Sequence, residues 1–385
     1  MLRAQDAEVV TFDSRNRRTL ATICAANLAY AFSSSMLGPS LPTIMSALSL
    51  DAWEVGSIAS VGAVGFLSVL PGGILADKRG KRKLMVAGLL IETFAYVIAG
   101  FSCDFYPLLL GLALFGVGAG FWEVAVSAFV PENFRDNPNG AMNVLHSTWG
   151  IGGFLGPMLA GLAISASGDW HLGFLVSAGF LAIAASIAHT LGSEGRAEVS
   201  PDPRLSRVIS SMPKGAVAAL ALGWGVELGL YAYLPLLLES ERGFGALEAS
   251  AALGFLLLMI AAGRMCWSRL SGRISMVKTI KLSGILACAS VLATAASPGP
   301  FALLPILSAG FFISSLAPTI LAYIGEKAAP SGTGMAIGLT LSAASVGGAA
   351  VPASSALVAG SASVSISFAF LGILLFPIFL LVRYP

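Results

Sequence analysis

Twelve long apolar stretches constrain the fold of this chain more than any other feature of its sequence. A helix that crosses a lipid bilayer needs about 20 mostly apolar residues, and each stretch is close to that length or longer. The stretches cover residues 19–45, 54–75, 83–102, 106–130, 139–166, 170–192, 213–238, 247–268, 276–297, 300–325, 332–358 and 362–382. We therefore predict an all-α membrane protein with twelve transmembrane helices.

The composition supports a membrane protein and excludes several other classes. Of the 385 residues, 56% are apolar and only 11% are charged, whereas charged residues make up about 25% of an average soluble domain. The formal net charge is only +2, which argues against a nucleic-acid partner held through its phosphates. The four cysteines and three histidines are scattered along the chain. We therefore predict no metal site, no cofactor and no catalytic residue, and hence no enzyme.

One long polar segment divides the chain into two halves. We predict a cytoplasmic tail, a six-helix bundle, a cytoplasmic linker and a second six-helix bundle, at residues 1–18, 19–192, 193–212 and 213–385. Gly272 and Gly348 follow Gly80 and Gly156 at the same spacing, which indicates an internal repeat. A repeat of this kind predicts two pseudo-symmetric bundles around a central cavity, with the substrate near the middle of the bilayer.

The positions of the charged residues predict the orientation in the membrane. We assign every lysine and arginine except Arg242 to one side, including Arg264 near the end of the eighth stretch. The loops of the other side carry acids such as Asp51 and Asp104. Because lysine and arginine accumulate in cytoplasmic loops, we predict a multi-pass protein of the cytoplasmic (inner) membrane with both termini in the cytoplasm.

The loop between the second and third stretches contains a specific motif. It reads Gly73-Ile-Leu-Ala-Asp77-Lys78-Arg79-Gly80-Lys81-Arg82. A glycine at its start allows two helices to approach closely, and the second glycine allows a tight turn. The acid can cap a helix or pair with a cation of a neighbouring helix.

This motif resembles the loop signature of the major facilitator superfamily, at every position. The resemblance extends over all twelve stretches and implies transport by alternating access, with the Asp77 loop as a cytoplasmic latch. In the fifth stretch, Gly152, Gly156 and Pro157 resemble the antiporter motif of the same family. The predicted gating residues are Gly73, Asp77, Lys78, Gly80, Lys81, Arg82, Gly152, Gly156 and Pro157.

Two acids lie deep within apolar stretches, Glu123 in the fourth and Glu227 in the seventh. An ionised carboxylate at the centre of a membrane helix costs about 2.5–3.5 kcal/mol even on the lenient insertion scale. We therefore expect both acids to be protonated, hydrogen-bonded or in contact with a water-filled cavity. A carboxylate that exchanges its proton as the cavity changes sides would couple proton flow to transport. His146 can titrate near physiological pH and is a third predicted proton-coupling residue.

The surroundings of these acids resemble one branch of the superfamily, the fucose–proton symporters. The similar segments are the stretch from Glu123 to Val130, the stretch from Glu227 to Pro235, and Asn143 with His146 and Trp149. In that branch a glutamate in the fourth span serves coupling, which the resemblance implies for Glu123. We predict a substrate site formed by Asn27, Tyr30, Ser34, Glu123, Asn143, His146, Trp149, Trp224, Glu227 and Tyr231.

These features together predict a secondary active transporter that moves a small organic solute, a sugar or a similar polar metabolite, with protons as the coupling ion. A drug– or metabolite–proton antiporter remains the alternative, because of the motif in the fifth stretch, and a non-transporting membrane receptor is a further one. The expected partners are the small-molecule substrate, protons or another coupling cation, and the lipid bilayer. The family resemblance implies a monomer.

Overall fold

Helices make up all the regular structure in the described part of the chain. The structure, a computed structural model, describes residues 14–191, 205–328 and 332–382. The helices of the first half are α1 (Ser14–Ser34), α2 (Leu37–Leu48), α3 (Ala52–Phe66), α4 (Val69–Arg79), α5 (Lys81–Gly100), α6 (Phe105–Asn133), α7 (Pro138–Ser167) and α8 (His171–His189). Those that follow are α9 (Leu205–Ser211), α10 (Lys214–Glu241), α11 (Ala246–Leu270), α12 (Met276–Ala296), a short 3-10 helix (Gly299–Ala302), α13 (Leu303–Ile313), α14 (Leu316–Ala328), α15 (Thr333–Ser361) and α16 (Val364–Leu381).

Twelve spans of the described residues are long and apolar enough to cross a bilayer. Each of them overlaps one of the twelve stretches predicted from the sequence, so the predicted all-α fold with twelve transmembrane helices is confirmed. The physical reason is that lipid offers no hydrogen bonds to the backbone, and a helix satisfies its own N–H and C=O groups internally.

Three of the predicted helices are each divided into two by a break. The breaks lie between α1 and α2, between α3 and α4, and between α13 and α14. Serines lie at all of them, and serine side chains compete for the carbonyl groups of the preceding turn. Ser35 donates to the carbonyl of Ala31 at 2.8 Å, and Ser314 donates to the carbonyl of Phe311 at 2.7 Å. Ser68 instead donates to the carbonyl of Val117 in α6 at 2.9 Å, and this bond holds the break in the second span against α6.

The ends of the predicted segments differ from those in the structure. Helix α1 begins at Ser14, inside the predicted tail, and the linker contains the short helix α9. Residues 1–13 of the tail and 193–204 of the linker lie outside the described residues.

Polar side chains cap the starts of several helices. Asp51 accepts from the N–H of Glu54 at 2.8 Å, and Glu54 accepts in return from the N–H of Asp51 at 3.0 Å. This pair is a capping box at the start of α3.

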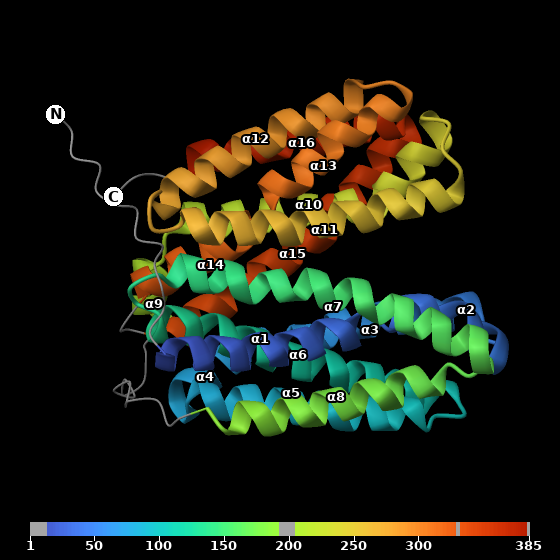
Figure 1. Ribbon diagram of the computed structural model, residues 1–385, viewed down its shortest axis with the longest axis horizontal. Helices are drawn as coiled ribbons and strands as arrows, with labels where there is room; N and C mark the ends of the chain where they lie inside the picture. Colours follow the sequence, from blue (N-terminus) through green and yellow to red (C-terminus); the bar gives the residue numbers. More distant parts are fainter. Residues whose placement is uncertain (1–13, 192–204, 329–331, 383–385) are drawn as a thin grey trace.

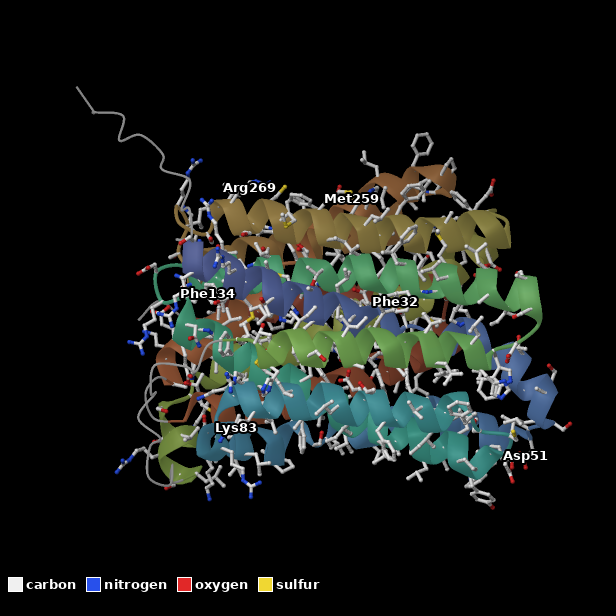
Figure 2. The ribbon with its side chains drawn as sticks, turned by 60° about the horizontal axis from the view of Figure 1, so that its bottom comes forward. Phe32, Asp51, Lys83, Phe134, Met259 and Arg269 are labelled. Atoms are coloured by element: carbon white, nitrogen blue, oxygen red, sulfur yellow. The ribbon has the colours of Figure 1, made fainter. Side chains whose placement is uncertain are left out.

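Figure 1 shows α1–α8 in the lower part of the molecule and α10–α13 with α16 in the upper part, with α14 and α15 between them. Figure 2 shows Lys83 and Arg269 at one end of the molecule and Asp51 at the other. We call these the basic end and the acidic end. Helices α7 and α11 lie side by side near the basic end and diverge toward the acidic end (Figure 1).

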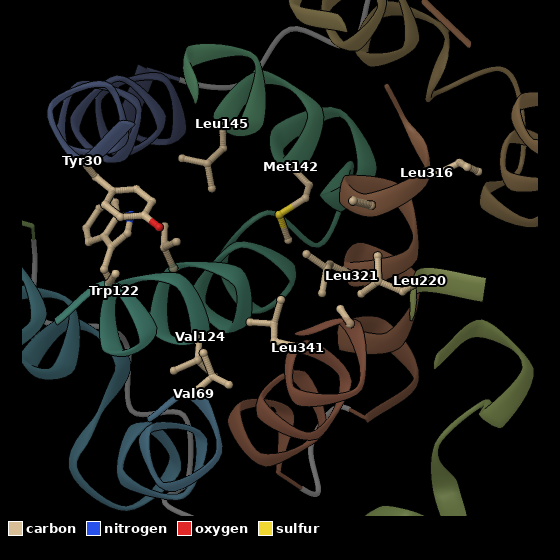
Figure 3. Packing of buried hydrophobic residues seen from close by; sticks show 14 of the residues in the cluster. Tyr30, Val69, Trp122, Val124, Met142, Leu145, Leu220, Leu316, Leu321 and Leu341 are labelled. Atoms are coloured by element: carbon tan, nitrogen blue, oxygen red, sulfur yellow. The ribbon is translucent and has the colours of Figure 1, made fainter. Parts of the chain in front are cut away.

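Apolar side chains fill the interface between the two groups of helices. In Figure 3, Met142 of α7 faces Leu321 of α14 and Leu341 of α15, and all three side chains are fully buried. Val69 of α4 and Val124 of α6 lie nearby and are also fully buried. This packing removes apolar surface from water, and this burial holds the two groups of helices together at the basic end.

The close packing of α5 against α6 depends on glycine, because glycine has no side chain to separate the two helices. A Cβ atom on Gly118 of α6 would lie 2.7 Å from the carbonyl oxygen of Gly88 in α5 and 2.9 Å from the amide nitrogen of Glu92. We expect Gly118→Leu to destabilise the protein by about 1–3 kcal/mol because of overpacking, seen as a lower midpoint of thermal unfolding. Gly161→Leu is the control, since no atom lies within 4 Å of its Cβ position. Equal midpoints for the two variants would contradict this account of the α5–α6 packing.

Candidate functional site

The two deep acids lie on opposite sides of the interface, Glu123 on α6 and Glu227 on α10. The Glu123 side chain is 6% exposed and that of Glu227 is 13% exposed. Glu123 accepts a hydrogen bond of 3.3 Å from Ser127, and Glu227 accepts one from the hydroxyl of Tyr231. Both carboxylates are thus directed into the protein and bonded there, which an orientation toward lipid would not allow.

A buried arginine lies between these two acids. The Arg264 side chain of α11 is 6% exposed. Its Nη2 lies 3.3 Å from a carboxylate oxygen of Glu227, its Nη1 donates to the carbonyl of His146 at 2.8 Å, and its Nε donates to the carbonyl of Ser314 at 3.1 Å. Arg264 therefore joins α7 of the first half to α10 and to the break between α13 and α14 in the second half.

The position of Arg264 corrects the prediction that placed it with the loop cations of the basic end. It lies inside the eighth span, Ala251–Leu270, and not in the loop that follows. Its guanidinium stays in the core because the acid and the two carbonyl groups satisfy it. One of those carbonyls, at Ser314, cannot accept from the residue four positions later, because Pro318 has no N–H.

His146 of α7 connects the arginine to Glu123. Its Nε2 lies 3.9 Å from a carboxylate oxygen of Glu123, too far for a hydrogen bond. This nitrogen is buried and has no hydrogen-bond partner among the described residues. The polar groups therefore form an almost continuous row from Glu123 through His146 and Arg264 to Glu227 and Tyr231, and this row crosses the interface between the two halves.

The predicted residue Asn143 lies one turn from His146 but makes different contacts. Its amide nitrogen donates to the carbonyl and side-chain oxygens of Asn139, at 2.9 and 2.8 Å. Thr319 of α14 also donates to the side-chain oxygen of Asn139, at 2.8 Å. Asn143 is fully buried, and its own side-chain oxygen has no partner among the described residues. Asn143 thus belongs to a small polar cluster shared by α7 and α14.

The predicted residues of the first span differ in how far their polar atoms are already used. Asn27 donates at 3.1 Å to the carbonyl of Leu145 and to the hydroxyl of Thr148, and accepts from the indole N–H of Trp122 at 3.1 Å. It therefore ties α1 to α6 and α7. Tyr30 is buried and stacks on Phe115. Ser34 donates to the carbonyl of Ala31 at 3.0 Å.

Trp149 and Trp224, the two predicted tryptophans, are both half-buried. Trp149 of α7 lies on the same face as Asn143 and His146 by its spacing, and a Cβ on Gly153 would contact its ring at 3.7 Å. Trp224 of α10 lies one turn before Glu227 and beside Gly348 of α15. Neither ring is sealed in the core, so both remain candidates for contact with a solute.

The predicted latch residues meet the second half at the basic end. Asp77 accepts from the backbone N–H groups of Gly334 and Met335, both at 2.9 Å. These groups begin α15, so the carboxylate caps that helix and lies at the positive end of its dipole. Lys81 pairs with Asp77 at 3.2 Å and with Glu132 of α6 at 2.7 Å. The side chains of Asp77 and Lys81 are each 7% exposed, so water screens these pairs little.

The glycines of the latch permit this contact. A Cβ on Gly73 would collide with the carbonyl of Gly334, so that only glycine lets α4 and α15 approach this closely. Gly80 has a φ of 94°, a conformation that favours glycine, and it forms the turn between α4 and α5. Arg82 donates to the carbonyl of Leu191 after α8 at 2.5 Å, and Lys78 lies in the last turn of α4.

The glycines of the fifth span have a different partner. A Cβ on Gly152 would lie 2.6 Å from the carbonyl of Leu28, and one on Gly156 would collide with the carbonyl of Phe32. Both neighbours belong to α1, so this motif packs the first and fifth spans of the first half together. Pro157 lies inside α7, where it removes one backbone hydrogen bond and allows bending.

A family model described as Major Facilitator Superfamily matches residues 23–352, most of the chain. The chain belongs to the Major Facilitator Superfamily. It is therefore a multi-pass membrane transporter and not an enzyme.

Relatives and solved structures of the superfamily agree with this assignment. The chain is 26% identical over 305 residues to "Enterobactin exporter EntS" of Salmonella choleraesuis (strain SC-B67), a match that covers 73% of this chain and 69% of the relative. It is 18% identical to a variant of the E. coli Fucose:proton symporter FucP, with a TM-score of 0.84 over 95% of this chain and 98% of that one. A FucP structure in the outward conformation gives a TM-score of 0.83 at 19% identity, with the same coverage. These structures establish the fold.

Arg264 is a candidate functional residue that was not predicted from the sequence. A cation inside the predicted span 247–268 was a visible signal, because arginine within a membrane helix is costly and usually functional. The signal was lost because neighbouring cations at the end of the span suggested a loop. Its contacts also depend on tertiary packing, since Glu227 lies 37 residues and His146 lies 118 residues from it in the sequence.

Proposed function

We propose that the chain is a proton-coupled carrier of a small polar organic solute, a sugar or a similar polar metabolite, that works by alternating access between its two halves. The row of polar groups from Glu123 to Glu227 carries this proposal. It lies at the interface between helices of both halves, where a bound solute can be exposed to either side. The solute-binding residues are those predicted from the sequence, together with Arg264.

The contacts at the basic end support a state that is closed there. Asp77 holds the start of α15, and Ser271 after α11 donates to the side chain of Asn137 before α7 at 2.8 Å. Ser268 donates to the carbonyl of Gly140 at 3.0 Å. Opening toward the basic end requires these contacts to break. Among the predicted gating residues, Asp77 makes the bonds to α15 and Gly73 lies against Gly334, which supports a latch role for the Asp77 loop.

The surroundings of Glu123 support a role in proton coupling. The only hydrogen bond to its carboxylate among the described residues comes from Ser127, and His146 lies just beyond bonding distance. A carboxylate with so few partners gains little from being ionised in a dry site. Access of water to this site changes when the halves move, and the carboxyl group then takes up or releases its proton. Glu227 and His146 complete the proposed proton-coupling set.

We propose that the protein lies as a monomer in the cytoplasmic membrane with its basic end in the cytoplasm. Lys83 in the first turn of α5 and Arg269 in the last turn of α11 lie at the basic end, and Asp51 before α3 lies at the acidic end (Figure 2). Positive charge is retained on the cytoplasmic side during insertion. Both termini then lie in the cytoplasm.

The test of the proposed function is transport by purified protein in sealed vesicles that contain a pH-sensitive dye. Sugars, sugar acids, amino acids and organic acids are added outside one at a time. A substrate of a proton symporter should enter and acidify the interior, and an uncoupler should abolish its accumulation. Entry of a substrate without any change of internal pH would overturn the proton coupling, and failure of every solute to enter would overturn the carrier function.

Export in exchange for protons is the second candidate. It is favoured by the identity to a relative named as an exporter and by the glycine–proline motif that packs α7 on α1. The vesicle assay separates the two directions of coupling. An exchanger should make the interior more alkaline when solute enters, because each solute that enters drives protons out, whereas a symporter should make it more acidic.

A further inference from the structure

Two of the three bonds that hold Arg264 are to uncharged groups. The carbonyls of His146 and Ser314 accept from Nη1 and Nε, and these bonds fix the plane of the guanidinium. Neither carbonyl carries a net charge, so neither neutralises the arginine. The counter-charge comes from Glu227, through one contact at Nη2.

The contact between Arg264 and Glu227 is the longest of the three. Its length is 3.3 Å and it involves a single carboxylate oxygen, whereas charge-assisted bonds are typically about 2.7–2.9 Å and arginine–carboxylate pairs are often bidentate. The same oxygen of Glu227 also accepts from Tyr231. The pair is therefore far from the best geometry available to an arginine, and a better-placed carboxylate can replace Glu227.

A second group at this place lacks a partner. The buried Nε2 of His146 has no hydrogen bond among the described residues, although the backbone carbonyl of the same residue accepts from Arg264. A buried nitrogen without a partner in a folded protein is uncommon, and a ligand can satisfy it. The arginine and this nitrogen lie at the interface of the two halves, where the solute must bind.

We propose that Arg264 is the anion-binding group of the central site, and that the transported solute carries a carboxylate that replaces Glu227 as the partner of its guanidinium. This inference rests on the proposed carrier function and narrows it to acidic solutes, sugar acids included. The selectivity follows from charge, because a neutral solute cannot take over the neutralisation of a buried arginine.

Charge balance requires a proton to accompany the anion. When the solute carboxylate binds Arg264, Glu227 takes up a proton from water and its carboxyl group becomes neutral, so the net charge of the site is unchanged. The charged and titratable groups that face Glu227 are Arg264 from α11 and Tyr231 from α10 itself. Helices α15 and α16, which also pack on α10, contain no titratable residue, and in α14 these residues are Tyr323, Glu326 and Lys327, toward its basic end.

The test uses acetate and its uncharged analogue acetamide with the purified variant Glu227→Gln. This variant leaves Arg264 without its counter-charge, so that acetate should bind and raise the midpoint of thermal unfolding at constant ionic strength. Acetamide should not. The control is the double variant Glu227→Gln/Arg264→Gln, which removes both charges and leaves no guanidinium to bind the anion. Acetate affinity should be at least about tenfold lower in the double variant, the loss expected for a bond to a charged group.

The pH dependence tests the exchange of partners in the unsubstituted protein. Acetate should bind more tightly at pH 6 than at pH 8, because Glu227 must take up a proton first, and this dependence should weaken in Glu227→Gln. Equal stabilisation of the single and double variants by acetate would overturn the anion site. So would transport that accepts glucose and rejects glucuronate.

The two proposals fail in different experiments. If glucose or another neutral solute enters vesicles together with protons, and acetate does not stabilise Glu227→Gln, the carrier function stands and the anion site is wrong. If acetate stabilises Glu227→Gln but no solute moves with protons, the anion site stands and the proton-coupled carrier function is wrong.

Discussion

Replacing Glu123 with glutamine should sharply lower solute accumulation driven by a pH gradient. Glutamine keeps the size of the side chain and can still accept from Ser127, but it cannot take up or release a proton. With the membrane potential held at zero, a gradient of two pH units can support about 100-fold accumulation for each proton carried with a solute. We expect Glu123→Gln to accumulate about 100-fold less solute than the unsubstituted protein, because it carries one proton fewer with each solute while Glu227 still carries its own.

The measurement is uptake of labelled solute into vesicles with a fixed pH gradient, compared with exchange of solute without a gradient. Exchange should survive in Glu123→Gln, because the halves can still move with a neutral side chain at this position. Glu248→Gln is the matched control, since this exposed acid only caps the start of α11 by accepting from the N–H of Gly245. Undiminished accumulation by Glu123→Gln would show that another group carries the proton.

The number and positions of the twelve spans could be predicted from the sequence because they depend on local composition. Each span must satisfy its backbone internally and present apolar side chains to lipid, and both requirements appear within about 20 consecutive residues. The broken spans were not predicted. The bond from Ser68 to Val117 links residues 49 apart in the chain, and a local pattern does not contain this information.

The candidate site could be predicted in part, for the same reason. Glu123 and Glu227 were recognisable because an acid in an apolar stretch is conspicuous in any sequence. The position of Arg264 between them depends on the packing of α6, α7, α10 and α11. The latch could likewise be predicted only in part. Its motif around Asp77 was recognisable in the sequence, but its partner at the start of α15 was not. Asp77 bonds to Gly334, which lies 257 residues further along the chain.

Replacing Asp77 with asparagine should shift the protein from the state closed at the basic end toward one that is open there. The carboxylate accepts from two backbone N–H groups of α15 and pairs with Lys81, whereas asparagine offers one acceptor oxygen and no charge. A hydrogen bond to a charged group contributes about 1.5–3 kcal/mol. A loss of about 2–3 kcal/mol changes the ratio of closed to open states by about 30- to 150-fold.

The shift is measurable as a distance between spin labels at Lys83 and Arg269, two exposed positions at the basic end on opposite halves (Figure 2), after replacement of the native cysteines. Asp77→Asn should lengthen this distance in most molecules. The matched control is Asp169→Asn at the acidic end. Asp169 is 52% exposed, and hydrogen bonds from His171 hold the pKa of this carboxyl below its ordinary value, so it is ionised at neutral pH. The control therefore removes one negative charge, as Asp77→Asn does, but the bonds of Asp169 are to His171 of the same half, so no contact between the halves is lost among the described residues. An unchanged distance in Asp77→Asn would show that the latch is held by the apolar packing of α4 on α15 and not by this carboxylate.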